Sequence, residues 1–185
     1  MVDYKTFKKE YLNEWVDQSQ AARKAAEELA MRDTTSLRDK YKPQNVIMTL
    51  NGKQVEFKAE NEKNPNDTKY NLFTYYEAKK LFEAPDDQGW RLPTYKELFA
   101  LCKLSYEFDT ANDVGIFDNK LQLPAAGLCD SGLEVYDVGR SGNYWVLTPD
   151  DWDVLNLRFT SHGAVIDDNS FRSARFSVRL VRDVK

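Results

Sequence analysis

An Asn-Gly pair, Asn51-Gly52, joins two strand-like runs and constrains the fold of this chain more than any other short feature. The flanking runs, residues 46–50 and 53–57, are rich in Val, Ile, Leu and Phe. Both central residues of a two-residue hairpin turn need positive φ, which Asn and Gly tolerate better than other residues. The sequence therefore predicts an antiparallel β-hairpin over residues 46–57.

Two short helices are predicted to follow the hairpin. Residues 72–82 carry apolar side chains at helical spacing, and Pro85 lies just beyond their end. The second helix is expected to begin at Thr94, because Glu97 follows at the spacing of a capping box. Cys102 is expected on the apolar face of this second helix.

The first 43 residues differ in character from the rest of the chain. Residues 3–40 are rich in Glu, Lys, Arg, Gln and Ala, and Gly and Pro are absent before Pro43. This composition predicts an N-terminal helix, which either lies on its own domain or serves as an attachment or oligomerisation segment. We therefore expect two parts, residues 1–43 and 44–185.

The second half of the chain has the alternation typical of strands. In residues 154–160, Leu155, Leu157 and Phe159 would share one face of a strand, and Asn156 and Arg158 the other. Helices followed by such strands predict an α+β fold with two helices and a small antiparallel sheet, plus the N-terminal helix. The strands are expected over residues 121–124, 143–148, 154–160, 164–166 and 176–181.

Composition excludes several classes of function. The formal net charge is -4 and no cluster of Lys and Arg stands out, so nucleic acid is not an expected partner. No apolar run reaches the length of a membrane span. The residues after Met1 lack a basic stretch and an apolar core, so no signal peptide is expected in the chain.

Catalytic chemistry is not expected either. His162 is the only histidine, and it lies beside Gly163 in a predicted turn. Ligands for zinc and a Gly-rich phosphate loop are missing from the sequence. Cys102 and Cys129 are interpreted as two buried thiols, with a single bridge between them as the alternative. We therefore expect a protein that is not an enzyme.

Three segments in order carry a resemblance to a known family. They are Gly89 to Leu98 (GWRLPTYKEL), Leu123 to Gly127 followed by Gly139 to Trp145 (LPAAG, GRSGNYW), and Arg172 to Arg182 (RSARFSVRLVR). Together they resemble the bacterial and phage C-type-lectin-like family that includes the variable proteins of diversity-generating retroelements. The likeness covers residues 70–183. It implies a C-type-lectin-like domain over residues 44–185, with a variable region at about residues 143–180.

The same fold is shared at a distance with formylglycine-generating enzymes. Those enzymes use cysteine chemistry, and Cys102 and Cys129 do not lie in a matching motif. Several residues of the three segments are instead expected to hold the fold. Trp90 and Trp145 offer large buried area, and Arg91 and Arg179 are suited to buried carbonyls or carboxylates.

The resemblance places a ligand-binding face between the Tyr-Trp strand and the closing strand. The chain departs from the family there, with Val146 in place of a small serine and Arg175 in place of a Gly. Aromatic, Arg and amide side chains in this region are of the types enriched where binding energy concentrates. The expected contact residues are Val146, Thr148, Asp150, Asp151, Trp152, Asp153, Asn156, Arg158, His162, Asp168, Asn169, Phe171, Arg172 and Arg175.

These features predict a ligand- or receptor-binding protein of a phage or bacterium, displayed on a virion tail or a bacterial cell surface. Its partner would be a protein or glycan receptor on a target cell, and the N-terminal helix would allow a homo-oligomer. Two alternatives remain. A calcium-dependent carbohydrate-binding lectin is suggested by the oxygen ligands of Asp150, Asp151, Asp153, Asp167, Asp168 and Asn169, although the Trp-Asn-Asp motif of such lectins is incomplete here. A structural assembly protein of a virion is the other. No cofactor is expected unless the calcium alternative holds.

Overall fold

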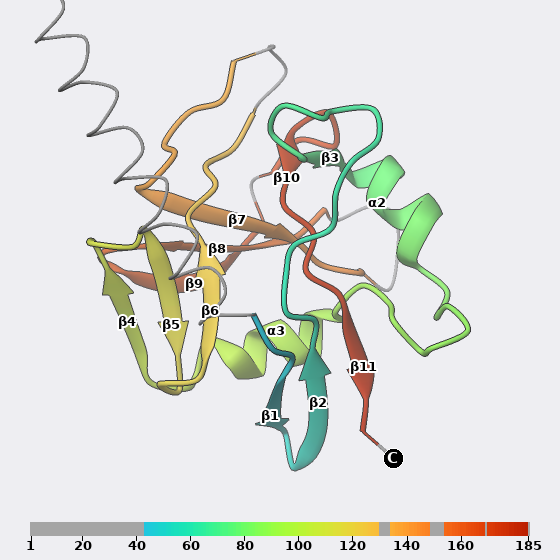
Figure 1. The fold of residues 1–185 in the computed structure, drawn as a ribbon, viewed down its shortest axis with the longest axis vertical. Coiled ribbons are helices and arrows are strands. Elements are labelled where there is room, and N and C mark those ends of the chain that lie inside the picture. The colour runs from blue at the N-terminus through green and yellow to red at the C-terminus, as the bar shows by residue number, and fades with distance from the viewer. Residues whose placement is uncertain (1–42, 130–133, 149–153, 169, 185) are drawn as a thin grey trace, which may run out of the picture. The chain divides into compact units, whose positions relative to one another are not determined.

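Strands dominate the part of the chain that the computed structural model describes, which is residues 43–129, 134–148, 154–168 and 170–184. They form four small antiparallel sheets (Figure 1), and residues 44–185 make one unit by themselves. The sheets are β1–β2–β11 (Val46–Leu50, Lys53–Phe57, Val181–Asp183), β3–β10 (Phe73–Thr74, Arg175–Phe176), β4–β5–β6 (Tyr106–Asp109, Val114–Phe117, Leu121–Pro124) and β7–β8–β9 (Ser141–Trp145, Asn156–Thr160, Gly163–Asp167). The two described helices are α2 (Tyr75–Phe82) and α3 (Tyr95–Leu101).

The expected α+β class, a C-type-lectin-like fold with one small sheet, is wrong. Among the described residues the structure is mainly small antiparallel sheets, with only two short helices. The strands β4 and β5 were not predicted, because an alternation over four residues is too short to recognise. The closing segment, expected as one strand over residues 176–181, instead divides between β10 and β11, which belong to different sheets. The predicted N-terminal helix lies outside the described residues.

Both described helices begin where the side chains supply hydrogen bonds that the backbone lacks. Thr94 caps α3 and Glu97 returns its carboxylate to the Thr94 backbone N–H, which confirms the predicted capping box. α2 has an equivalent box formed by Thr74 and Glu77. It begins three residues later than the predicted start, because residues 73–74 pair with β10 instead.

The predicted hairpin is also confirmed. β1 and β2 pair in register from Val46 opposite Phe57 to Leu50 opposite Lys53, and both turn residues have positive φ. The alternate residues Met48, Leu50, Val55 and Phe57 are buried. The hairpin therefore contributes one apolar face to the core and leaves its other face in solvent.

The core consists of two apolar clusters on either side of β7. The first joins the β4–β5–β6 sheet to the inner face of β7–β8–β9, with Phe117, Tyr144 and Phe159 at its centre. Gly142 makes this contact possible, since a Cβ there would lie 2.0 Å from the Phe159 ring. The second cluster surrounds Trp145, whose ring centroid lies 4.3 Å from that of Phe176.

Trp145 and Arg179 satisfy their polar groups as the sequence predicted. The Trp145 indole Nε1 donates to the Phe73 carbonyl at 2.6 Å. The buried Arg179 guanidinium donates to the carbonyl oxygens of Lys58 and Ala59 at 2.8 and 2.7 Å. Burial lowers the pKa of Arg179, yet these acceptors let the charge remain inside the fold.

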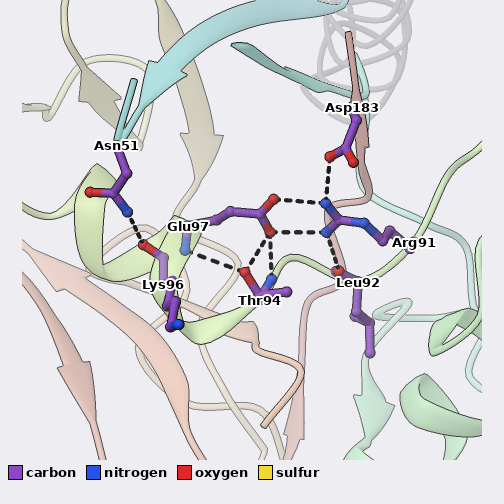
Figure 2. Close-up of polar contacts among 7 residues, drawn as sticks. All are labelled: Asn51, Arg91, Leu92, Thr94, Lys96, Glu97 and Asp183. Carbon is purple, nitrogen blue, oxygen red and sulfur yellow. Dashed lines mark hydrogen bonds and ion pairs between the residues drawn. The ribbon is translucent and has the colours of Figure 1, made fainter. Parts of the chain in front are cut away.

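A partly buried ion pair fixes the start of α3 (Figure 2). Arg91 donates through both terminal nitrogens to the Glu97 carboxylate, at 2.9 and 2.7 Å. One of these nitrogens also contacts Asp183 of β11 at 2.7 Å. Nearby, the Asn51 amide of the hairpin turn donates to the Lys96 carbonyl at 3.1 Å. The network therefore ties α3 to the β1–β2 turn and to β11.

Neither described helix has the length and apolar character needed to cross a membrane. Cys102 and Cys129, which both lie in the described part of the chain, are not joined by a disulfide. The interpretation of two thiols is therefore confirmed over the alternative of a bridge.

The variant Glu97→Gln is expected to lower the free energy of unfolding by about 2 kcal/mol at pH 7, because a neutral amide gives up the charge-assisted bonds to Arg91. Burial by itself would raise the pKa of Glu97, but hydrogen bonds from Arg91 and Thr94 hold it below its usual value of 4.5. The carboxylate therefore stabilises the fold above that pH, and the contribution is lost as the pH falls through the lowered folded value.

Urea unfolding of the unaltered chain and of Glu97→Gln, at pH 7 and near pH 3.5, measures this effect. The difference between their free energies of unfolding should be smaller at the acidic pH. Glu83→Gln is the matched control, because Glu83 is exposed at the end of α2 and its ion pair with Lys79 is long, at 3.7 Å. A difference that is as large in acid as at neutral pH would contradict this role of the Glu97 charge.

Candidate ligand-binding face

One face of the β7–β8–β9 sheet is sealed in the core, and the candidate site is the polar part of the other face, next to the buried Trp145. Because opposite residues of antiparallel strands share a face, Asn143 of β7, Arg158 of β8 and Val165 of β9 lie side by side. Asn156 lies on the same face, two residues before Arg158. The sealed face carries Tyr144, Leu157 and Phe159.

A hydrogen-bonded floor underlies one end of this face. The Asn156 amide donates to the Asn143 side-chain oxygen at 3.3 Å, and the Ser170 hydroxyl donates to the Asn156 oxygen at 2.6 Å. Asn143 donates in turn to Ser141 at 3.1 Å and to the Gly127 carbonyl at 3.3 Å. Both asparagines are buried, so the floor is rigid and closed to a ligand.

Beside the floor, the side chains become exposed. Arg158 is exposed and makes a long ion pair with Asp167, at 3.7 Å. Val165, on the neighbouring strand, is 57% exposed. A shallow hollow of about 280 Å³ is lined by Arg158, His162 and Val165 among others. These residues therefore present a cation, an imidazole and an apolar side chain to solvent from one hairpin.

A second exposed group lies where β10 meets α2. The Arg172 guanidinium donates to the Tyr76 hydroxyl at 2.9 Å, and its carbon lies 5.9 Å from the centroid of the Tyr76 ring. Phe171 is 72% exposed, the highest value among the large apolar residues described. Arg175 pairs with Thr74 in the β3–β10 ladder, close enough to contribute to the lowered pKa of Glu77.

Several opposing effects act on that Glu77 carboxyl. Burial raises its pKa, whereas hydrogen bonds from the Thr74 backbone and hydroxyl lower it, as do the charge of Arg175 and a long contact with Asn66. The sum lies below the usual value, so Glu77 is charged at neutral pH. Arg175, whose charge contributes to this lowering, is half-buried.

The structure divides the predicted contact residues into three sets. Val146, Thr148 and Asn156 are buried, and the Thr148 hydroxyl lies 2.7 Å from that of Tyr75, so these three side chains belong to the framework. The remaining described residues, Arg158, His162, Asp168, Phe171, Arg172 and Arg175, are exposed or half-buried. Asp150, Asp151, Trp152, Asp153 and Asn169 lie outside the described residues.

Two exposed residues of this region were missed by sequence reasoning. Tyr76 follows the buried Tyr75 and lies about 100° further round α2, away from the buried pair Tyr75 and Ala78. That spacing was the signal for an exposed aromatic side chain. Val165 was expected in a short strand with Ala164 and Ile166. The structure shows that Val165 is the exposed residue of the three.

No family model, curated protein or solved structure matches this chain. The assignment of the face therefore depends on the geometry of the chain itself. Its resemblance to retroelement variable proteins stays a prediction.

Neither cysteine has the environment of a reactive thiol. Burial raises the pKa of Cys102 to about 11, so very little thiolate exists at neutral pH. Cys129 is buried. The exposed His162 has its ring Nδ1 3.4 Å from the hydroxyl of the neighbouring Ser161, a contact within one turn. These positions are those expected of structural thiols and a surface imidazole.

Substitutions two residues apart on β8 should separate the framework from the exposed face. Asn156→Ala is expected to lower the free energy of unfolding by about 2 kcal/mol, because Asn143 and Ser170 lose buried partners. Arg158→Ala should change it by less than about 0.5 kcal/mol, since its side chain is exposed. Chemical denaturation of both variants measures the difference, and equal losses would contradict the division.

Proposed function

We propose that this chain is a ligand- or receptor-binding protein. Its contact surface is formed by the exposed side chains of the β8–β9 hairpin and of the β10–α2 junction. The observation that carries the proposal is the change from sealed to exposed side chains along one face of β8, where Asn156 is 1% exposed and Arg158 projects into solvent.

The hydrogen-bonded floor supports recognition because its hydrogen bonds do not involve the exposed contact residues beside it. Asn143, Asn156 and Ser170 satisfy one another, and no buried side-chain nitrogen or oxygen among the described residues lacks a partner. A framework of this kind holds its shape when neighbouring exposed residues change. The contact residues are therefore free to be selected for a ligand rather than for stability.

The exposed side chains have the chemistry of contact surfaces. An exposed Phe, a Tyr paired with an Arg and a second Arg on the adjoining sheet combine rigid apolar area with directional donors. Tyr and Arg are enriched at the residues that contribute most to binding energy. A protein or glycan receptor on a target cell is the class of partner that such a mixed surface fits.

At the finer level, we propose a variable protein of a diversity-generating retroelement, acting at a virion tail or a bacterial cell surface. The support is the resemblance of the three segments, together with a framework that separates fixed from exposed residues. The departure at Val146 does not contribute, because that side chain is fully buried and serves packing. The departure at Arg175 lies at the edge of the proposed surface.

Two libraries built on the full chain test the contact surface. Randomising Arg158, Val165, Phe171 and Arg172 should leave most members folded and yield binders of about 1 μM or tighter to some member of a panel of bacterial surface proteins and glycans. Randomising Asn143, Thr148 and Asn156 should leave few members folded. With the library members displayed on cells, protease resistance measures folding, and titration with each panel member measures binding.

Equal loss of folding in the two libraries would refute the proposed surface. The same panel, tested with the unaltered chain with and without a chelator, separates a calcium-dependent lectin from the proposal. Binding that disappears with the chelator supports the lectin, and binding that persists supports direct side-chain recognition.

The retroelement proposal predicts a pattern in the neighbouring DNA. A reverse transcriptase gene should lie close by, together with a near-copy of the codons for residues 143–180. Differences between the copy and the coding repeat should fall at adenine positions and should change exposed residues such as Arg158 and Arg172. Sequencing of the locus in several isolates tests this, and an invariant locus without a near-copy would exclude diversification.

A further inference from the structure

The strand β9 has an open edge. β9 is the last strand in the order β7–β8–β9, and it pairs with β8 alone. The pair Thr160 and Gly163 flanks the two-residue turn, so hydrogen bonds are exchanged there and at every second pair beyond it. The backbone N–H and C=O groups of Ala164 and Ile166 therefore point away from β8.

Those outward groups make no backbone hydrogen bond to any other described residue. A row of N–H and C=O groups on an exposed edge is a template for another strand. Edges of this kind are commonly blunted by charge, and neither Ala164 nor Ile166 carries a charge. The edge thus has the main-chain chemistry to accept an extended peptide.

A groove runs along this edge, with α3 as its opposite wall. Its volume is about 610 Å³, and its lining includes Tyr95 and Phe99 from α3, Ala164 and Ile166 from β9, and Leu155, which directly precedes β8. Phe99 is 41% exposed and stacks on Tyr95 with ring centroids 5.5 Å apart. The groove therefore offers an apolar wall beside the open backbone groups.

Opposite charges lie at the two ends of the groove. The start of α3 lies near the end of β7, because Tyr95 donates its backbone N–H to the Leu147 carbonyl. That is also the end of β9 that Asp168 follows. The chain after α3 lies near the β8–β9 turn, where the Tyr106 hydroxyl donates to the Thr160 carbonyl. Lys103 and Asp168, both exposed lining residues, thus mark opposite ends.

We propose that this groove binds an extended peptide segment of a partner protein, added to β9 as an antiparallel strand. An apolar side chain of the peptide packs against Phe99 and Leu155. A basic residue at its amino end approaches Asp168, and an acidic residue at its carboxyl end approaches Lys103. Alternating backbone groups about 7 Å apart match a peptide main chain and not a sugar or a small metabolite.

A second copy of this chain is a less suitable occupant. In each copy α3 stands along the same edge of β9, so two such edges brought together would also bring both α3 walls into the space of one strand. A separate peptide carries no such wall. The site uses the edge of β9 rather than the exposed polar face of the sheet, and it adjoins the proposed receptor surface at Val165, which lines both the groove and the hollow beside Arg158.

Amide hydrogen exchange of the full chain tests the open edge. Without peptide, the Ala164 and Ile166 amides should exchange fast, and the Val165 and Asp167 amides, bonded to β8, should exchange slowly. Protection of Ala164 and Ile166 at every protein concentration would show that the same chain covers the edge. Protection that grows with concentration would show a second copy. Either result overturns the proposal.

Peptide binding tests the occupant. The probe is a fluorescent peptide of alternating Val and Thr, with Arg at its amino end and Glu at its carboxyl end. Anisotropy should detect binding below millimolar concentration, with protection of Ala164 and Ile166. Methylation of the backbone nitrogens that face β9 should weaken binding about tenfold or more, as should Phe99→Ala. The melting temperature of Phe99→Ala shows whether the fold survives.

Charge exchange supplies the matched control. A probe with its Arg and Glu interchanged should bind about fivefold more weakly to the unaltered chain. The double variant Lys103→Glu with Asp168→Lys should reverse that preference, and it also removes the Lys103 ammonium, which lies 4.3 Å from the centroid of the Phe99 ring. No binding at millimolar probe, or equal binding of the methylated and unmethylated probes, would overturn the proposal.

Discussion

The contact between Arg91 and Glu97 is the interaction on which the arrangement of this protein most depends (Figure 2). Glu97 is part of the capping box that starts α3, so the same carboxylate serves a local and a long-range purpose. Arg91 extends the link to Asp183 on β11. Because both partners of the pair are largely buried, their bidentate geometry is retained where an exposed ion pair would be screened.

Placement of α3 by this ion pair affects the groove beside β9 but not the floor of the proposed receptor surface. The helix forms one wall of the groove beside β9, so the groove exists only while α3 is held. On the other side of the same sheet, the hydrogen-bonded floor of Asn143 and Asn156 keeps its form independently. The β7–β8–β9 sheet can therefore carry two recognition surfaces, one made of side chains and one made of an open backbone edge.

Much of the local structure was predictable, and the reasons are local. Capping of α3 needs only Thr94 and Glu97 at the right spacing, and the hairpin turn needs only residues that tolerate positive φ. The fold class was not predictable in the same way. β4 and β5 are short and half-buried, and their pairing partners are set by neighbours in space. The prediction of a single closing strand was wrong for a related reason, since β10 and β11 pair with strands of different sheets.

The sequence by itself determined the turns, the caps, the inward direction of Trp145 and the face that each residue of β8 occupies, because these follow from side-chain spacing and backbone preference over a few residues. Only the tertiary structure decided which polar residues of that face are sealed. Asn156 and Arg158 are equivalent in the alternation, yet Ser170 closes over Asn156 and leaves Arg158 exposed. Alternation specifies a direction from the backbone, whereas burial depends on which distant segment comes to rest there.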